Sequence, residues 1–267
     1  MSIQIQKVVA DTLEMNYFRF GSGEKTMVIL PGLSVQSVMG SAQAVADEYA
    51  VMKDEFTVYL FDRRTELPPD YNIYDMADDT AKAIKALGLS DIYLFGASQG
   101  GMIAMTVAIL YPELVRKLAL GSTASDTDGM EGGALDKWIS LAKDGDRVGL
   151  YLEFGRAIYP ESVFEQYRDV LAAAGQSVTD EELDRFVILA KGTKGFDMTD
   201  RLTEIQCPVL AIGSTDDEVL GAAPTWKIVQ RLADRQDFSY HMYEGFGHAA
   251  FDTAPDYRER LYAFFMQ

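Results

Sequence analysis

Short apolar runs that alternate with helical segments constrain the fold of this chain more than any other feature. The runs lie at 27–30, 58–61, 92–95 and 115–120, and the stretches 41–53, 76–87 and 102–110 repeat apolar residues every three or four positions. The pattern returns with runs at 209–212 and 238–243 and helices at 226–232 and from 257. Near-continuous apolar runs are typical of parallel strands that are covered on both faces. The sequence therefore predicts an α/β fold with a mostly parallel central sheet and helices on both faces, preceded by strand-like segments at 3–9 and 15–20.

The segment 125–200 interrupts this alternation. It contains no convincing strand and has helical patterns at 135–143, 148–158, 162–173 and 181–190, the last after a capping sequence that begins at Thr179. We interpret 125–200 as an all-helical lid inserted into a core formed by 1–124 and 201–267. The alternative is an additional helical layer with no functional role.

Charge excludes several classes of partner. The chain of 267 residues has 41 acidic and 24 basic side chains, a net charge of −17, which disfavours nucleic acids and anionic membranes. Its N-terminus has no signal-peptide pattern, and no apolar run approaches the roughly 18–20 residues of a membrane span. The single cysteine, Cys207, allows no internal disulfide. We expect a cytoplasmic protein that acts on a small-molecule substrate without nucleic-acid or membrane partners, and a homo-oligomer is compatible with the sequence.

A glycine-rich turn follows the strand-like run at 92–95. Its sequence is Gly96-Ala97-Ser98-Gln99-Gly100-Gly101, and a helix follows. A serine between glycines in a strand–turn–helix setting is typical of a nucleophile elbow, because the sharp turn leaves no room for side chains at the flanking positions. The turn also places Ser98 at a helix N-terminus, where developing negative charge is favoured. A glycine-rich turn with a capping serine is the alternative interpretation.

The chain resembles the α/β-hydrolase superfamily over nearly its whole length. In that family the order along the chain is nucleophile, acid, base, and here Ser98, Asp216 and His248 occur in that order, each after an expected core strand. The resemblance is close in kind to cofactor-free esterases and peroxidase-like hydrolases with a helical lid. It implies no cofactor, and a triad in which His248 activates Ser98 and an aspartate orients His248.

The acid and the base each have competitors. Asp216 lies three positions after Gly213, the spacing that the family favours, but Asp217 is adjacent, and Asp126 or Asp128 follows an earlier strand. The only other histidine, His241, lies within the strand-like run 238–243, and we interpret it as a hydrogen-bonded structural residue.

The resemblance also implies an oxyanion hole made of backbone N–H groups. One donor is Gln99, immediately after the nucleophile. The second is Leu33, in Pro31-Gly32-Leu33, where many relatives have His-Gly. Ser34 could take this place instead of Leu33, and Pro31-Gly32 could be only a turn.

These residues predict a serine hydrolase that cleaves a small carboxylic ester, thioester or lactone through an acyl-serine intermediate. No metal-binding motif is present. The alternatives are another reaction on the same triad, such as carbon–carbon bond cleavage, a lyase step or incidental peroxidase activity, and a ligand-sensing binding protein. Between Asp126 and Asp200 there are 16 acidic and 8 basic residues, a net charge of −8, which predicts a preference for neutral over anionic esters. The reverse preference would point to Arg63 in the pocket.

Overall fold

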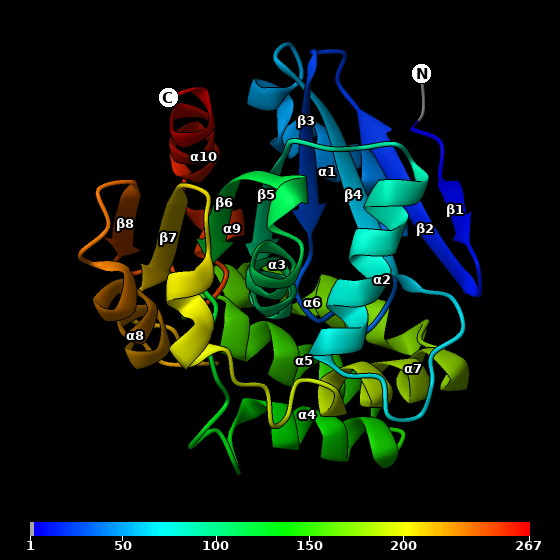
Figure 1. The fold of residues 1–267 in the computed structure, drawn as a ribbon. Coiled ribbons are helices and arrows are strands. Elements are labelled where there is room, and N and C mark those ends of the chain that lie inside the picture. Colours follow the sequence, from blue (N-terminus) through cyan, green and yellow to red (C-terminus); the bar gives the residue numbers. More distant parts are fainter. Residues whose placement is uncertain (1–2) are drawn as a thin grey trace.

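The computed structural model contains one eight-stranded sheet and describes residues 3–267; residues 1–2, at the start of the expected core segment 1–124, lie outside the described residues. The strands are β1 (Gln6–Ala10), β2 (Leu13–Phe20), β3 (Lys25–Leu30), β4 (Phe56–Arg64), β5 (Ile92–Ala97), β6 (Val115–Gly121), β7 (Val209–Ser214) and β8 (Phe238–Tyr243). Their order across the sheet is β1-β2-β4-β3-β5-β6-β7-β8 (Figure 1). Only β2 pairs antiparallel with its neighbours, β1 and β4, so the predicted mostly parallel sheet is confirmed.

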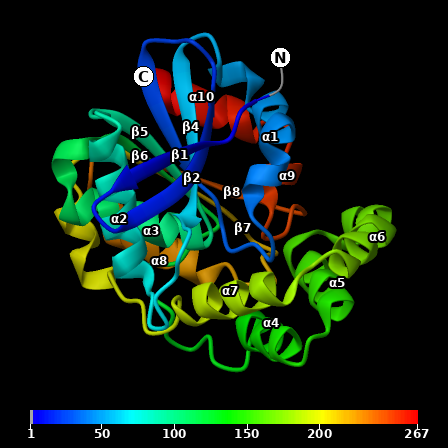
Figure 2. The same cartoon turned by 90° about the vertical axis from the view of Figure 1, so that its right-hand side faces the viewer.

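Helices cover both faces of this sheet, as predicted. On one face α2 (Ile73–Ala86), α3 (Gln99–Leu110) and α8 (Ala223–Leu232) pack on the largest hydrophobic cluster. On the other face lie α1 (Ala42–Glu48), α9 (Ala250–Thr253) and α10 (Tyr257–Met266), which pack on a second cluster (Figure 2). The sheet is therefore buried on both sides, which explains why its central strands are apolar along almost their whole length.

The region expected to form one helix at 41–53 is more irregular. It consists of a 3₁₀ turn η1 (Val38–Ser41), α1, and a second 3₁₀ turn η2 (Ala50–Met52). Tyr49 and Met52 are nevertheless buried, as the apolar spacing predicts, and are 7% and 0% exposed. Residues three apart share one face of a helical turn, so the inward-facing side of this segment is kept although the helix is interrupted.

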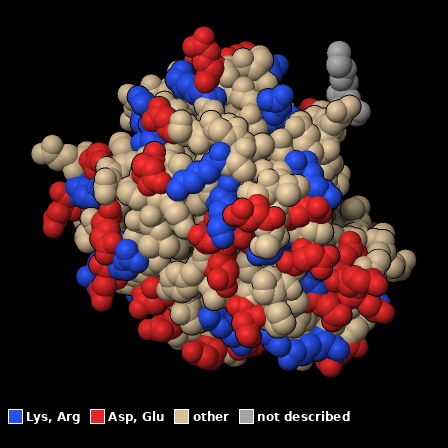
Figure 3. All heavy atoms as spheres, turned by 45° about the vertical axis from the view of Figure 1, so that its right-hand side comes forward, with Lys and Arg blue, Asp and Glu red and all other residues tan. Residues whose placement is uncertain are grey.

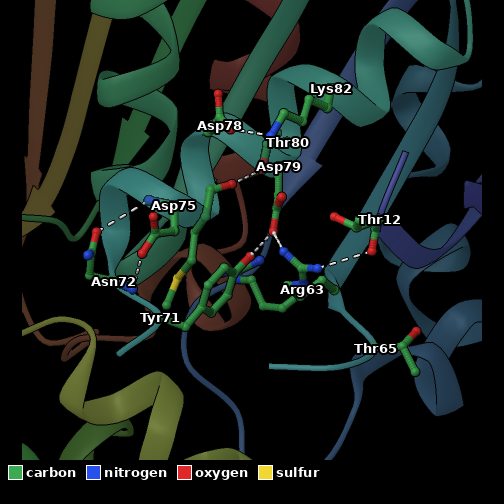
Figure 4. A network of polar contacts seen from close by, with 12 residues as sticks. Thr12, Arg63, Thr65, Tyr71, Asn72, Asp75, Asp78, Asp79, Thr80 and Lys82 are labelled. Atoms are coloured by element: carbon green, nitrogen blue, oxygen red, sulfur yellow. Dashed lines mark hydrogen bonds and ion pairs between the residues drawn. The ribbon is translucent and has the colours of Figure 1, made fainter. Parts of the chain in front are cut away.

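A buried polar network joins β4 to α2. The carboxylate of Asp79 accepts hydrogen bonds from the Tyr71 hydroxyl at 2.8 Å and from the Arg64 guanidinium at 3.3 Å. Helix α2 begins with a capping box in which Asn72 and Asp75 satisfy each other's backbone N–H groups (Figure 4). Desolvation and the neighbouring Asp79 charge raise the pKa of Tyr71 well above its usual value, so the phenol remains a donor. This network fixes the end of β4 beside the site described below.

Four helices separate β6 from β7, at the places the sequence predicted. They are α4 (Ala134–Lys143), α5 (Arg147–Ile158), α6 (Glu161–Gln176) and α7 (Asp180–Lys191), followed by a 3₁₀ segment η4 (Thr199–Glu204). They lie below the carboxyl ends of the strands in Figure 1 and have their own apolar cluster, which includes Trp138, Leu150 and Phe186. Among residues 3–267, none of the helices combines the length and the apolar character that crossing a bilayer requires.

Candidate active site

Ser98 occupies a strained turn between β5 and α3. Its backbone has φ 53° and ψ −122°, a conformation that is costly for a residue with a side chain. The surrounding backbone holds it there: the Ser98 N–H donates to the Gly121 carbonyl at 2.8 Å, and the Ser98 carbonyl accepts from the Thr123 hydroxyl at 2.7 Å. Strand β6 and the loop after it therefore hold Ser98 in this strained conformation, at the N-terminus of α3.

The glycines around Ser98 are required by close backbone contacts. A Cβ atom at Gly96 would lie 2.2 Å from the Gly100 carbonyl oxygen, and one at Gly100 would lie 2.0 Å from the Leu30 carbonyl oxygen. Both distances are far shorter than van der Waals contact. Because the neighbouring atoms belong to the backbone, a side chain could be accommodated only if the chain itself moved. This agrees with the expectation that the turn excludes side chains at these two positions.

His248 pairs with Asp217. The imidazole Nδ1 lies 2.7 Å from Asp217 Oδ2, and both side chains are almost fully buried. The other carboxylate oxygen of Asp217 accepts the backbone N–H groups of Val219 and Leu220 at 2.8 and 2.9 Å, which fixes its orientation. Because a carboxylate only accepts, Nδ1 carries the proton and Nε2 is left as the basic nitrogen.

The expectation that Asp216 faces His248 is wrong. Asp216 turns instead toward the backbone of the loop that contains His248, accepting from Gly245 N–H at 2.9 Å and Gly247 N–H at 3.0 Å, and from the Ser214 hydroxyl at 2.7 Å. Burial alone would raise the pKa of Asp216, but these hydrogen bonds outweigh it and hold the pKa below its usual value. Adjacent residues leave the end of β7 in different directions, so one of the pair holds the loop and the other contacts the imidazole.

The loop after β3 lies against the nucleophile. A Cβ atom at Gly32 would be 3.2 Å from Ser98 Cβ, so the loop is in contact with the elbow and is more than a remote turn. Neither the Leu33 N–H nor the Gln99 N–H has a hydrogen-bond acceptor within residues 3–267. An oxyanion hole requires two such free N–H groups beside the nucleophile, and the N–H of Ser34, the alternative to Leu33, likewise has no acceptor within these residues.

Two cavities open beside Ser98. The first, of about 250 Å³, is lined by His248 and by mainly apolar side chains of the β3 loop, α1 and the inserted helices. The second, of about 400 Å³, is lined by more polar groups, among them Gln99, Thr127 and Asp217. Ser98 and Leu33 line both cavities. A carbonyl carbon at Ser98 would therefore have room for a substituent on each side.

Comparisons with known proteins show which family has this fold. The alpha/beta hydrolase fold family model matches residues 25–157, about half of the chain. The chain belongs to the α/β-hydrolase superfamily. Its sequence is 24% identical over 224 residues to a protein of Agrobacterium fabrum that is provisionally named carbamate hydrolase RutD, covering 79% of this chain and 86% of that protein. A protein of Caulobacter vibrioides with the same name is 25% identical over 251 residues and 91% of each chain.

Solved α/β-hydrolases share the whole fold of this chain. MGS-M2, an α/β-hydrolase enzyme from a deep-sea metagenome library, superimposes with a TM-score of 0.85 at 19% identity, over 98% of each chain. The enol-lactonase of Burkholderia xenovorans gives 0.83 at 16% identity, over 98% of this chain and 100% of that one. A thermophilic esterase of Thermogutta terrifontis gives 0.79 at 21% identity, over 98% of each. At these identities the likeness concerns the fold.

Three other residues that the sequence singled out lie in different surroundings. Asp126 accepts from Lys227 Nζ and from the Thr199 hydroxyl, both at 2.7 Å, so its carboxylate is engaged away from His248. Asp128 donates its own N–H to Asp126. His241 was expected to be hydrogen-bonded; instead its ring packs edge-on against Tyr243 at 4.4 Å, and no hydrogen bond of its side chain occurs within residues 3–267. Burial lowers the pKa of His241, which keeps the ring neutral.

The sequence did not predict how Arg63 is used. Its guanidinium is buried, donates to the Pro31 carbonyl at 2.7 Å and lies 3.5 Å from Gln99 Oε1. Desolvation lowers the pKa of Arg63. Arg63 is not among the residues that line either cavity, so it supports the β3 loop and does not enter the space that a substrate would fill. In the sequence, the only sign of this role is that Arg63 and Arg64 follow an apolar strand-like run.

The inserted helices contribute to the first cavity and contact the histidine loop. Trp138 of α4, and Phe154 and Ile158 of α5, line the cavity. The Ile158 carbonyl accepts the N–H of Ala249, next to His248, at 2.8 Å. Of the other aromatic residues of the insertion, Phe164 and Phe186 are fully buried and Tyr167 is 45% exposed. The insertion therefore closes one side of the cavity and is attached to the candidate base.

Proposed function

We propose that this chain is a serine hydrolase that cleaves a small carboxylic ester, thioester or lactone. Ser98 Oγ attacks the carbonyl carbon while His248 Nε2 accepts its proton, and the Asp217 carboxylate stabilises the resulting imidazolium. The Leu33 and Gln99 N–H groups stabilise the oxyanion. His248 then protonates the leaving group. In the second half of the reaction, water attacks the acyl-serine carbonyl while His248 accepts its proton, and His248 returns that proton to Ser98 Oγ as the acid leaves.

One observation carries this proposal. A buried, backbone-anchored Asp217 holds His248 Nδ1, and that imidazole shares a cavity wall with a strained serine at a helix N-terminus. A histidine whose Nδ1 is occupied in this way has its Nε2 available as a base, which is what a hydroxyl nucleophile needs. A binding protein would have no need of a strained serine backed by such a pair.

The apolar wall supplied by α4 and α5 supports a role for the insertion as a lid. A lid excludes water and so strengthens the electrostatic interactions made with the reacting carbonyl. The first cavity, at about 250 Å³, favours compact acyl or alcohol groups over long chains. The esterase and the enol-lactonase among the structures of the same fold are consistent with this class of substrate.

Carbamate hydrolysis is a second candidate, favoured by the name that the sequence relatives carry. A carbamate carbonyl can be attacked by the same serine and stabilised by the same N–H groups. Its adjacent nitrogen makes the carbonyl less electrophilic, so the same site would react more slowly unless it binds that nitrogen.

Steady-state hydrolysis tests both candidates. We expect p-nitrophenyl acetate and butyrate to be turned over by the wild type, and Ser98→Ala to lower kcat by several orders of magnitude with the fold intact by circular dichroism. The matched control is Ser122→Ala, which removes a buried hydroxyl just after the neighbouring strand β6 that has no hydrogen-bond partner among the described residues 3–267. Retention of more than about a tenth of kcat by Ser98→Ala would overturn the assignment. Faster turnover of a p-nitrophenyl carbamate than of its matched ester would favour the second candidate.

A further inference from the structure

The mainly apolar first cavity has a carboxylate in its wall. Asp252, on the short helix α9 that follows His248, lines this cavity together with Tyr49 and Phe251. Within the described part of the chain, Asp252 supplies the one carboxylate that does so. The triad proposed above leaves Asp252 without a role. A charged group in an apolar wall is costly unless it is paired or hydrogen-bonded.

The neighbours of Asp252 leave much of its binding capacity free. Its closest cationic partner is Arg258, whose Nη2 lies 3.9 Å from Asp252 Oδ1. The same Nη2 is only 2.9 Å from Glu48 Oε2, so Arg258 pairs mainly with Glu48. About half of the Asp252 side-chain surface, 49%, remains open. A hydrogen-bonded ion pair would need a distance of about 2.7–2.9 Å, so Arg258 only partly compensates the carboxylate.

Asp252 lines the first cavity, so part of its open surface faces that space. Desolvation raises the pKa of Asp252 to about 6, even though Arg258, the Tyr159 hydroxyl and His248 lower it; Glu48 acts in the raising direction. At pH 8 the carboxylate is ionised and exposed to whatever fills that space.

We propose that Asp252 is a specificity-determining residue that binds a primary ammonium group on the part of the substrate that fills the first cavity. An ammonium group would form a charge-assisted hydrogen bond with the carboxylate, a neutral hydroxyl a weaker one, and a carboxylate group would be repelled. The apolar walls would hold the alkyl portion between this group and the reacting carbonyl. The inference rests on the proposed function, because it concerns the cavity that Ser98 and His248 share.

Binding to unreactive protein tests this inference separately from catalysis. Titration calorimetry would measure n-pentylammonium, 1-pentanol and pentanoate against Ser98→Ala at pH 8. We expect pentylammonium to bind about tenfold more tightly than pentanol, and pentanoate to bind most weakly. Adding Asp252→Asn should reduce the ammonium preference to less than about twofold. If the wild type failed to hydrolyse any ester while these affinities held, only the proposed function would fall.

A second carboxylate variant separates direct contact between Asp252 and the ammonium group from the general effect of removing one negative charge. Glu48→Gln removes a carboxylate that pairs with the same Arg258 but is not among the residues lining the cavity, and it should keep the ammonium preference. Lowering the pH from 8 to 5 protonates Asp252 and should weaken pentylammonium binding, and most of this pH dependence should be lost in Asp252→Asn. The proposal is overturned if Asp252→Asn keeps the preference, if Glu48→Gln loses it equally, or if pentanol binds as tightly as pentylammonium to the protein with Asp252 intact.

Discussion

Asp217 Oδ2 lies 2.7 Å from His248 Nδ1, whereas the carboxylate of the preceding residue, Asp216, holds the Gly245 and Gly247 N–H groups. Two neighbouring acids are thus committed to different tasks. We expect Asp217→Asn to lower kcat by about 10³–10⁴-fold, because the amide no longer stabilises the imidazolium and favours the wrong tautomer. Steady-state kinetics on folded protein would measure this loss.

Asp216→Asn is the matched control for that variant. It keeps a side chain of the same shape but weakens acceptance of two loop N–H groups, so we expect lower stability and a smaller loss of kcat, about tenfold. An equal or larger loss in Asp216→Asn would mean that the carboxylate facing His248 in the structure is not the one that works in catalysis.

The two histidines should differ sharply. His248→Ala removes the proposed base, and because the triad works as a unit, we expect the loss in kcat to be comparable to that of Ser98→Ala. His241, packed against Tyr243 on β8, should be replaceable by alanine with less than a twofold change in kcat. A dead His241→Ala variant that is still folded would place the base elsewhere.

Gly100 should tolerate no side chain. Its Cβ would meet the Leu30 carbonyl oxygen at 2.0 Å, so Gly100→Ala must displace either the β3 loop or helix α3. We expect a loss of about 2–3 kcal/mol in the free energy of unfolding, measured in urea, together with reduced kcat as the Leu33 N–H moves. Gly40→Ala, where nothing lies within 4 Å of the added methyl group, should change neither quantity appreciably.

The buried network at Asp79 should stabilise the fold without taking part in the chemistry. Asp79→Ala leaves Arg64 and the Tyr71 hydroxyl without their acceptor in a site where the Asp79 side chain is 5% exposed, and we expect a loss of about 3–5 kcal/mol in unfolding free energy. Glu165→Ala, on helix α6, removes a largely exposed pair with Arg168 and should cost less than about 1 kcal/mol. Similar losses from the two variants would contradict the importance given to burial.

The sheet and the elbow could be predicted from sequence because each depends on local patterns. Strand β5 is an apolar run that leads into Gly96 and Ala97, and the steric reason for glycine at 96 and 100 follows from the turn itself. The four inserted helices were predictable for the same reason, since each has its own apolar periodicity and α7 its own capping box.

Contacts between distant segments were not predictable in this way. The choice between Asp216 and Asp217 depends on which carboxylate meets the backbone of Gly245 and Gly247, some thirty residues later along the chain. Arg63 and Arg64 alternate along β4, so one contacts Pro31 and the other Asp79, and neither partner is visible from the strand alone. The position of Asp252 depends on the short helix α9, which the sequence did not predict.

Figure 3 shows that acidic side chains outnumber basic ones over the lower part of the face drawn, where the insertion lies, in keeping with its net charge of −8.

Covalent labelling tests the central claim, that Ser98 is the nucleophile activated by His248, most directly. A fluorophosphonate probe would react by attack of Ser98 Oγ on phosphorus with loss of fluoride, while His248 takes the proton. Intact-mass measurement followed by peptide mapping should find one adduct, on the peptide that contains Ser98, no adduct in Ser98→Ala, and much slower labelling in His248→Ala. An adduct on any other residue, or folded wild-type protein that remains unlabelled, would contradict the account.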